Sequence, residues 1–183
     1  RYHLRRGDSA QIHKLLHSGS VRLGFVGAML EPDSMTYFPM LEDHLVMCTA
    51  NNPHYQALKK QNVYGRDLLR EPTVAREEGS GTDRTVQSYM RNMGLADQDL
   101  HIVARVDDPE AIKRMTAQGV GVSVLSALSV ASEVDDGRLL TFPMDPQGLH
   151  RSIYPVYPRE TILSQSEQAF VRFCRQMAIR RNL

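Results

Sequence analysis

The chain lacks the features that mark several large classes of protein. It has only two cysteines among its 183 residues, Cys48 and Cys174, and two distant thiols make neither a disulfide scaffold nor a zinc cage. No apolar run approaches the ~18 residues of a membrane span. Its 22 Lys and Arg nearly balance its 21 Asp and Glu, which argues against a chain that coats nucleic acid by itself. We therefore expect two buried, inert thiols, no membrane partner and a reducing, cytoplasmic location.

The sequence also lacks an initiating methionine, because it begins at Arg1. Residues 1–6 have the pattern of a strand from the outset, and no apolar segment typical of a signal peptide is visible near the start. We interpret the chain as a fragment whose upstream part has been removed.

What remains is an ordinary globular composition, with 42% hydrophobic and 23% charged residues. Apolar runs alternate with stretches of helical periodicity, and this alternation is typical of the α/β class. Strands are predicted at residues 1–6, 21–26, 35–38, 44–49, 72–75, 101–106, 119–125, 139–142 and 152–157. Helices are predicted after Gly7, at 54–60, from Thr82 to Met93, from Pro109, after a cap at Ser126, and at 162–179.

The order of these elements predicts two lobes joined by two crossings. The chain enters a second lobe near Pro72 and leaves it at residues 143–146. We therefore expect a first lobe from residues 1–71 and 145–183, and a second lobe from residues 72–144. Such a hinged clamshell would hold its ligand in the crevice between the lobes.

Several local expectations accompany this division. The strand, helix and strand of residues 1–26 predict a parallel pair with a right-handed crossover. Pro155 predicts that the strand at 152–157 lies at a sheet edge or ends early. The helix after Gly81 should bury Val86, Tyr89, Met90 and Met93.

Motifs for catalysis and metal binding are mostly missing. The pair Gly119 and Gly121 lacks the third glycine of a dinucleotide-binding loop, since Val124 occupies that position. No nucleophile elbow, phosphate loop or His-Glu-x-x-His motif is present. His13 and His17 are spaced for one helix face, where a metal pair competes with a solvated face. The second interpretation is favoured, because no further ligand has a suitable spacing. We predict no catalytic residue, no metal site and no cofactor.

Gly79-Ser80-Gly81-Thr82, at a predicted helix start, is the most informative local pattern. Glycines allow the backbone to turn, the helix N-terminus offers free N–H groups, and the two hydroxyls can donate as well. Together they suit a small carboxylate or phosphate. Plain capping of a buried helix is the simpler alternative. The segment Gly7-Asp8-Ser9 raises the same two possibilities.

An ordered set of motifs along the chain resembles the effector-binding domain of LysR-type transcriptional regulators. The set includes Glu78-Gly79-Ser80-Gly81-Thr82, the run TAQGVGVSVL at residues 116–125, and EVDDGRLL at 133–140. Each segment alone is weak evidence for the family. The match is specific because the segments occur in the family's order over nearly the whole chain. Arg22 and Ser126 depart from the family pattern.

This resemblance implies two Rossmann-like lobes of the type 2 periplasmic-binding-protein-like fold. It implies a small-molecule effector between the lobes, self-association into dimers or tetramers, and DNA contact only through an N-terminal domain absent here. The family's first regulatory strand and helix are also missing from this sequence. Carried over by position, the predicted effector-binding residues are Asp8, Ser9, Gly27, Ser80, Gly81, Thr82, Val106, Asp107, Val122 and Ser123.

The sequence therefore predicts the sensing domain of a LysR-type regulator that binds a small, anionic metabolite and has no enzymatic activity. The alternative is a periplasmic solute-binding protein of the same clamshell architecture. An enzyme on the same scaffold ranks last, because no motif supports it.

Overall fold

The structure is a computed structural model that describes residues 3–181, apart from the side chains of residue 97 and residues 179–181. Arg1 and Tyr2, the start of the predicted first strand, lie outside the described residues. The chain forms two compact units. The first comprises Arg1–Glu42, Gly79–Gly81 and Ser152–Leu183, and the second comprises Asp43–Glu78 and Thr82–Arg151. The predicted lobe ranges, 1–71, 72–144 and 145–183, stay a prediction.

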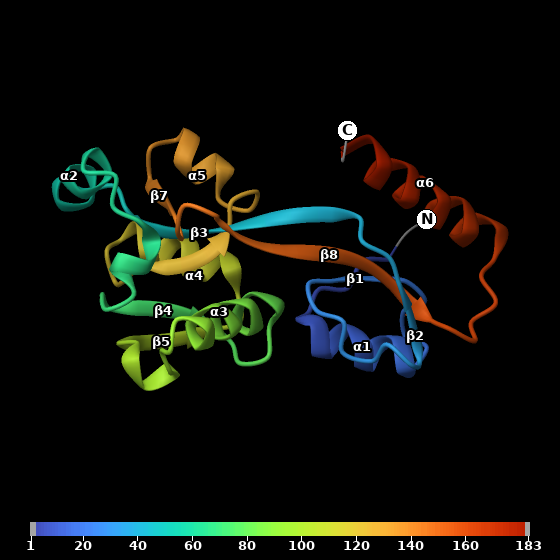
Figure 1. Cartoon of the computed structure of the whole chain (residues 1–183). Coiled ribbons are helices and arrows are strands. Elements are labelled where there is room, and N and C mark those ends of the chain that lie inside the picture. The colour runs from blue at the N-terminus through green and yellow to red at the C-terminus, as the bar shows by residue number, and fades with distance from the viewer. Residues whose placement is uncertain (1–2, 182–183) are drawn as a thin grey trace. The chain divides into compact units, whose positions relative to one another are not determined.

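The first unit is built around β8, the last strand in the sequence. It contains α1 (Ser9–His17), β1 (Gly24–Val26), β2 (Met35–Tyr37), most of β8 (Leu149–Pro158) and α6 (Gln165–Arg181) (Figure 1). Both β1 and β2 pair antiparallel with β8. The core of this unit consists of Ile12, Leu16, Val26, Met35 and Val156.

The second unit combines an antiparallel group of strands with a parallel pair. β3 (Leu41–Ala50) pairs antiparallel with β6 (Ser123–Ser126) and β7 (Leu139–Pro143). β4 (Thr73–Arg76) and β5 (Ile102–Val106) are parallel, as expected for strands connected through a helix. The helices are α2 (Pro53–Lys60), α3 (Gly81–Asn92), α4 (Pro109–Ala117) and α5 (Ala131–Asp135), with 3₁₀ turns at Gly65–Leu68 and Asp97–Asp99.

Local signals explain most helix boundaries. The Asp8 carboxylate accepts from the Gln11 backbone N–H at 2.7 Å, and the Gln11 side chain accepts from the Asp8 N–H in return. This reciprocal capping box starts α1. The Asp108 side chain caps α4, whose first residue is Pro109. The missing proline N–H costs nothing there, because the first N–H groups of a helix have no partner within it.

The start of the chain differs from its prediction. Residues 3–8 contain no strand, and β1 pairs antiparallel with β8 rather than parallel with an earlier strand. The predicted parallel crossover is therefore wrong within the described residues. Alternating residue types alone could not show that the segment has no strand to pair with.

Three further expectations are corrected. Pro155 lies within β8 opposite Phe25, and β8 has a partner on each side at Val156, so this strand is no edge in its unit. Ser126 ends β6 instead of capping a helix, and α5 begins only at Ala131. Met93 is 42% exposed, whereas Met90 on the same helix is 1% exposed. Met93 follows the last residue of α3, so the helical spacing no longer governs it.

The two thiols are buried and free, as predicted. Burial raises the pKa of Cys48 to about 12 and also raises the pKa of Cys174. Both thiols therefore remain protonated and unreactive at neutral pH. Over the described part of the chain, no helix combines the length and apolar character that crossing a membrane requires.

Candidate functional site

The start of α3 carries the glycine-rich segment that the sequence singled out. Gly79 has φ +80°, a left-handed conformation that glycine adopts without strain, and it turns the chain from β4 into the helix. The side chains that follow are buried: Ser80 is 1% exposed and Thr82 is 3% exposed. Gly79–Gly81 belongs to the first unit and Thr82 to the second. Thr82 and its partners Arg151 and Asp43 all lie in the second unit.

Thr82 is bound to a buried ion pair of the second unit. The Arg151 guanidinium donates through Nη1 to Thr82 Oγ1 at 2.9 Å. Its Nε and Nη2 each lie 2.9 Å from one carboxylate oxygen of Asp43. The Ser126 hydroxyl donates to the other oxygen of Asp43 at 2.6 Å. This network fixes the first turn of α3 to β3 and β8, and it places a positive charge beside the helix start.

A pocket of about 40 Å³ opens next to Thr82. A water molecule needs roughly 10–15 Å³ on this measure, so the pocket can take a small polar group or a few waters. Its apolar walls include Met47, Met90 and Val124. Its polar lining comes from Thr73, Arg76, Thr82, Asp83, Gln87 and Arg105.

The charges at this pocket are paired within the second unit. Arg105 Nη1 lies 3.2 Å from Asp83 Oδ1 and also donates to the Arg76 carbonyl at 3.2 Å. Arg76 makes two hydrogen bonds of 2.7 Å to the carboxylate of Glu77. An anionic ligand would compete with Asp83 or Glu77 for these guanidinium groups, so the pairs would set its binding strength.

The other predicted residues of the second unit have mixed environments. Val122 is fully buried; its N–H donates to the Pro72 carbonyl and its carbonyl accepts from the Val74 N–H. It therefore joins β4 to the β6 segment. Ser123 is also fully buried, and its hydroxyl has no hydrogen-bond partner among the described residues. Val106 ends β5, and Asp107 is exposed just beyond it.

The predicted residues of the first unit mainly serve local structure. Asp8 caps α1. Ser9 is buried, and its carbonyl contacts His13 Nδ1 at 2.6 Å. Gly27 directly follows β1. Asp8 therefore has the capping role of the simpler interpretation. Effector binding by Asp8, Ser9, Gly27, Ser80 and Gly81 stays a prediction.

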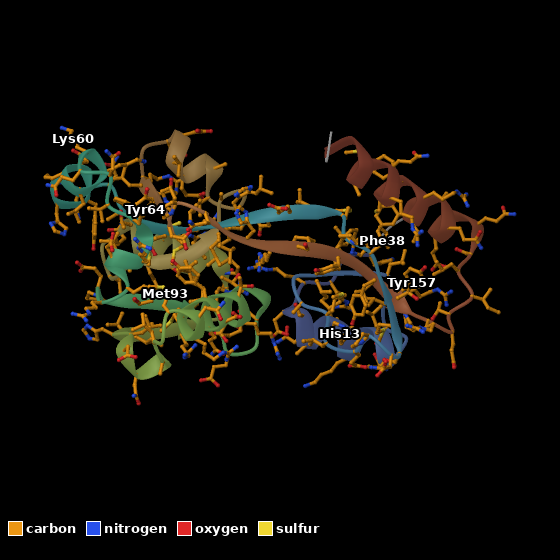
Figure 2. The ribbon with its side chains drawn as sticks, viewed as in Figure 1. His13, Phe38, Lys60, Tyr64, Met93 and Tyr157 are labelled. Atoms are coloured by element: carbon orange, nitrogen blue, oxygen red, sulfur yellow. The ribbon has the colours of Figure 1, made fainter. Side chains whose placement is uncertain are left out.

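The His13 and His17 pair is neither a metal site nor a uniformly solvated face. His13, labelled in Figure 2, is 2% exposed. Its two ring nitrogens contact the Ser9 carbonyl and the Tyr37 hydroxyl. His17 is exposed and lies 2.6 Å from a carboxylate oxygen of Glu31. A buried histidine whose two nitrogens have protein partners offers no lone pair to a metal ion.

Sequence reasoning missed Asp43, Arg151, Arg76 and Arg105. Asp43, Arg151 and Arg105 meet partners from distant segments, whereas Arg76 pairs with its neighbour Glu77. No local pattern links Asp43 to Arg151. One signal was available: Asp43 alternates with the exposed Glu42 and His44 on β3, and a carboxylate on the inward face of a strand requires a partner.

These features define a class of protein: an α/β ligand-binding domain whose polar groups gather at the start of one helix. A family model described as "LysR substrate binding domain" matches residues 1–178. The chain belongs to this family. Its structural relatives are LysR effector-binding domains, and the fold is their type 2 periplasmic-binding-protein-like fold, as the sequence predicted.

Individual relatives match most of this chain. The HTH-type transcriptional activator CmpR of Synechocystis is 26% identical over 93% of this chain and 54% of its own length. The phosphonates import ATP-binding protein PhnC of Anaeromyxobacter dehalogenans is 28% identical over 96% of this chain and 34% of its own length. The regulatory domain of CcmR from Synechocystis, solved with 2-PG, is 26% identical with a TM-score of 0.78, covering 94% of this chain and 79% of that one. The chain thus spans about a third to a half of these curated relatives.

Proposed function

We propose that this chain is the sensing domain of a transcriptional regulator that responds to a small, anionic metabolite. The family match over residues 1–178 carries the proposal. The curated relatives that are transcriptional regulators extend well beyond the matched region, and a DNA-binding domain would lie in that additional length. Ligand binding would then change DNA binding through a shift between two conformations.

The start of α3 supplies the chemistry for such a ligand. The N–H groups of the first helical turn attract negative charge, and Thr82 presents a hydroxyl beside the Arg151 guanidinium. The CcmR regulatory domain was solved with 2-PG, which makes 2-PG a reasonable first probe for this chain. Ser80, Gly81 and Thr82 would contact the ligand. The remaining predicted residues would surround it.

The binding test uses isothermal titration of 2-PG into the full chain and into Thr82→Val. Valine keeps the shape of threonine and removes the hydroxyl. The loss of one hydrogen bond to a charged group costs about 1.5–3 kcal/mol, so we expect Kd to rise about 10- to 150-fold. Thr161→Val, a similar change in the loop before α6, should leave Kd unchanged. Equal affinities for the two variants would contradict the site, and no saturable binding of 2-PG would contradict this ligand.

A second candidate is a solute-binding domain that serves an importer. It is favoured by one observation, namely that the relative PhnC is an import ATP-binding protein. The coding sequence upstream of Arg1 separates the two candidates. A helix-turn-helix domain there would support the regulator. A secretion signal would support a periplasmic solute-binding protein and would overturn the regulator.

The regulator proposal carries further expectations about the whole protein. It would be cytoplasmic, would form dimers or tetramers, and would contact DNA through a domain outside this sequence. It would need no cofactor and would catalyse no reaction. Analytical ultracentrifugation of the complete gene product, with and without operator-containing DNA, tests both the oligomeric state and the DNA contact.

A further inference from the structure

The pocket beside Thr82 is also a gap in the apolar core of the second unit. All of its lining residues belong to residues 43–78 or 82–151, so it lies within one compact unit. Met47, Leu69 and Val124 line it and are members of a buried core cluster as well. Protein interiors are close-packed and contain few voids larger than a water molecule. An open space of about 40 Å³ in such a core is therefore a place where a small ligand can bind.

The side chains of α3 change from polar to apolar along this pocket. Thr82 and Asp83 come from the first turn of the helix, Val86 and Gln87 from the second, and Met90 from the third. Helical residues four apart share one face, and eight residues span about 12 Å. The pocket therefore has a polar end near Asp83 and an apolar end near Met90.

Both signs of charge are present at the polar end. Arg105 Nη1 lies 3.2 Å from Asp83 Oδ1, and Gln87 Nε2 donates to Asp83 Oδ2 at 3.2 Å. The Asp83 side chain is 8% exposed and that of Arg105 is 26% exposed, so solvent reaches the guanidinium. Arg76 and Arg105 lie at the carboxyl ends of the parallel strands β4 and β5. Open α/β sheets bind their ligands at this end of the strands.

The ion pair of Arg105 and Asp83 disfavours a ligand with a single charge. A carboxylate alone would bring two negative groups together at one guanidinium, and an ammonium alone would bring two positive groups together at one carboxylate. Like charges that share a site repel each other. A ligand that carries both charges avoids this repulsion, because its carboxylate can accept from Arg105 while its ammonium donates to Asp83. One ion pair is then replaced by two.

The volume of the pocket limits the apolar part of the ligand. A water-sized group needs roughly 10–15 Å³ on this measure, so about three such groups fill the pocket. The isopropyl group of valine is of this size. A cavity that binds benzene measures about 150 Å³, so an aromatic ring does not fit. Met47 and Met90 are unbranched and adaptable, which allows a slightly longer aliphatic chain.

We propose that this pocket binds a small aliphatic α-amino acid of the size of valine. The carboxylate would contact Arg105, the ammonium would contact Asp83, and the side chain would lie among Met47, Met90 and Val124. This amino acid would be a second ligand, distinct from the anion proposed at the start of α3. Its binding is measured without 2-PG, so the two proposals can fail independently.

The first test is isothermal titration of L-valine and three related compounds into the full native chain. Isovalerate is valine without its ammonium group, and isobutylamine is valine without its carboxylate. We expect one saturable site for L-valine and at least a 10-fold higher Kd for either analogue, because each lacks one of the two ion pairs. L-Phenylalanine should not bind. The proposal is overturned if L-valine shows no saturable binding, or if any of the three compounds binds within two-fold of its Kd.

Two substitutions then locate the bound amino acid. Asp83→Asn removes the partner of the ammonium at nearly constant size, and Met90→Phe fills the apolar end. Each should raise the Kd for L-valine at least 10-fold. Arg91→Gln changes an exposed residue of the same helix and should keep the native Kd. Thermal melts establish that each variant is folded, and the ligand series on the native chain decides the matter if one is not. A native Kd in both Asp83→Asn and Met90→Phe would place the amino acid elsewhere and overturn the site.

Discussion

Truncation of Arg151 should be among the most damaging single substitutions in the second unit. The Asp43 side chain is 3% exposed, and Arg151 supplies two of the three hydrogen-bonding groups that approach its carboxylate; Ser126 supplies the third. Arg151→Ala would leave this charge buried with one hydroxyl donor. Removing one partner of a buried ion pair costs about 3–5 kcal/mol, and Thr82 would lose its guanidinium donor as well.

Urea unfolding followed by circular dichroism measures this cost. With a slope of about 2 kcal/mol per molar urea, the midpoint should fall by roughly 2 M. Arg138→Ala is the matched control, since Arg138 pairs with Asp136 and Glu133 while its side chain is 52% exposed. An exposed pair contributes at most about 1 kcal/mol.

A double replacement separates the charge from the packing. Asp43→Leu combined with Arg151→Met removes both charges and fills similar volume, so it should recover most of the stability lost in Arg151→Ala. The reasoning is refuted if Arg151→Ala lowers the midpoint no more than Arg138→Ala does. It is also refuted if the double replacement is less stable than Arg151→Ala.

Two further predictions concern ionisable groups. Hydrogen bonds from Arg22 and from the Ser164 N–H lower the pKa of Glu167 to about 2. In an unfolded chain this carboxyl has a pKa of about 4.3. The shift therefore stabilises the folded protein above pH ~4.3, and this stabilisation is lost as the pH falls toward 2. Glu167→Gln should therefore flatten the decline in thermal stability between pH 5 and 2, and an unchanged slope would contradict it. Burial raises the pKa of the Cys48 thiol to about 12, so Ellman's reagent at pH 8 should label this thiol only in urea. The Cys174→Ala variant leaves Cys48 as the single thiol to be measured. Rapid labelling of this variant in its native state would contradict the prediction.

The sequence predicts elements best where their signals are local. The caps at Asp8 and Asp108 and the glycine turn at Gly79 give the starts of α1, α4 and α3 within a residue or two. Each signal depends only on residues within three positions of the helix start. The apolar run at 119–125 predicted the start of its strand less well. Gly119 has φ +79° and Val120 is 46% exposed, so the strand begins only at Ser123.

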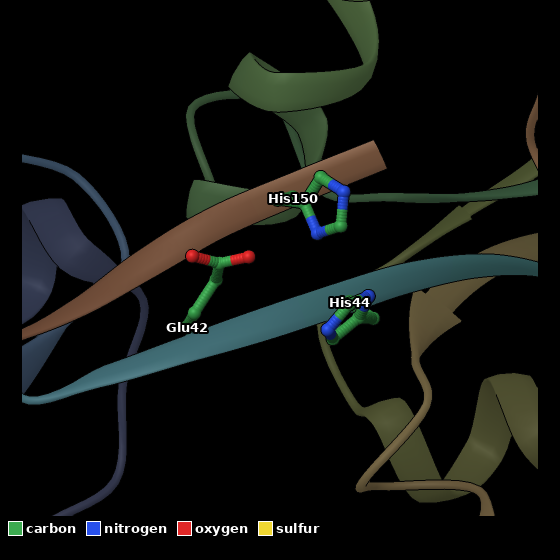
Figure 3. A group of neighbouring side chains, drawn as sticks. All are labelled: Glu42, His44 and His150. Carbon is green, nitrogen blue, oxygen red and sulfur yellow. The ribbon is translucent and has the colours of Figure 1, made fainter. Parts of the chain in front are cut away.

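The same distinction applies to the candidate sites. Thr82 could be found from the glycine-rich pattern because the pattern itself makes the helix start. Arg151 could not, since β8 meets β3 only in the folded chain. Arg151 and the adjacent His150 lie on opposite faces of β8. Arg151 turns toward buried Asp43, and His150 faces outward beside His44 (Figure 3). Strand alternation explains this division once the strand is known.

The pairing of β1 and β2 with β8 also dictates an order of assembly during synthesis. β1 and β2 leave the ribosome early, yet the strand that joins them begins at Leu149. Residues 43–151 have by then supplied every strand of the second unit. The first unit must therefore wait, with Val26 and Met35 uncovered, until the last part of the chain arrives. Because closing such long loops slows folding, this early segment is where a growing chain depends most on protection from aggregation.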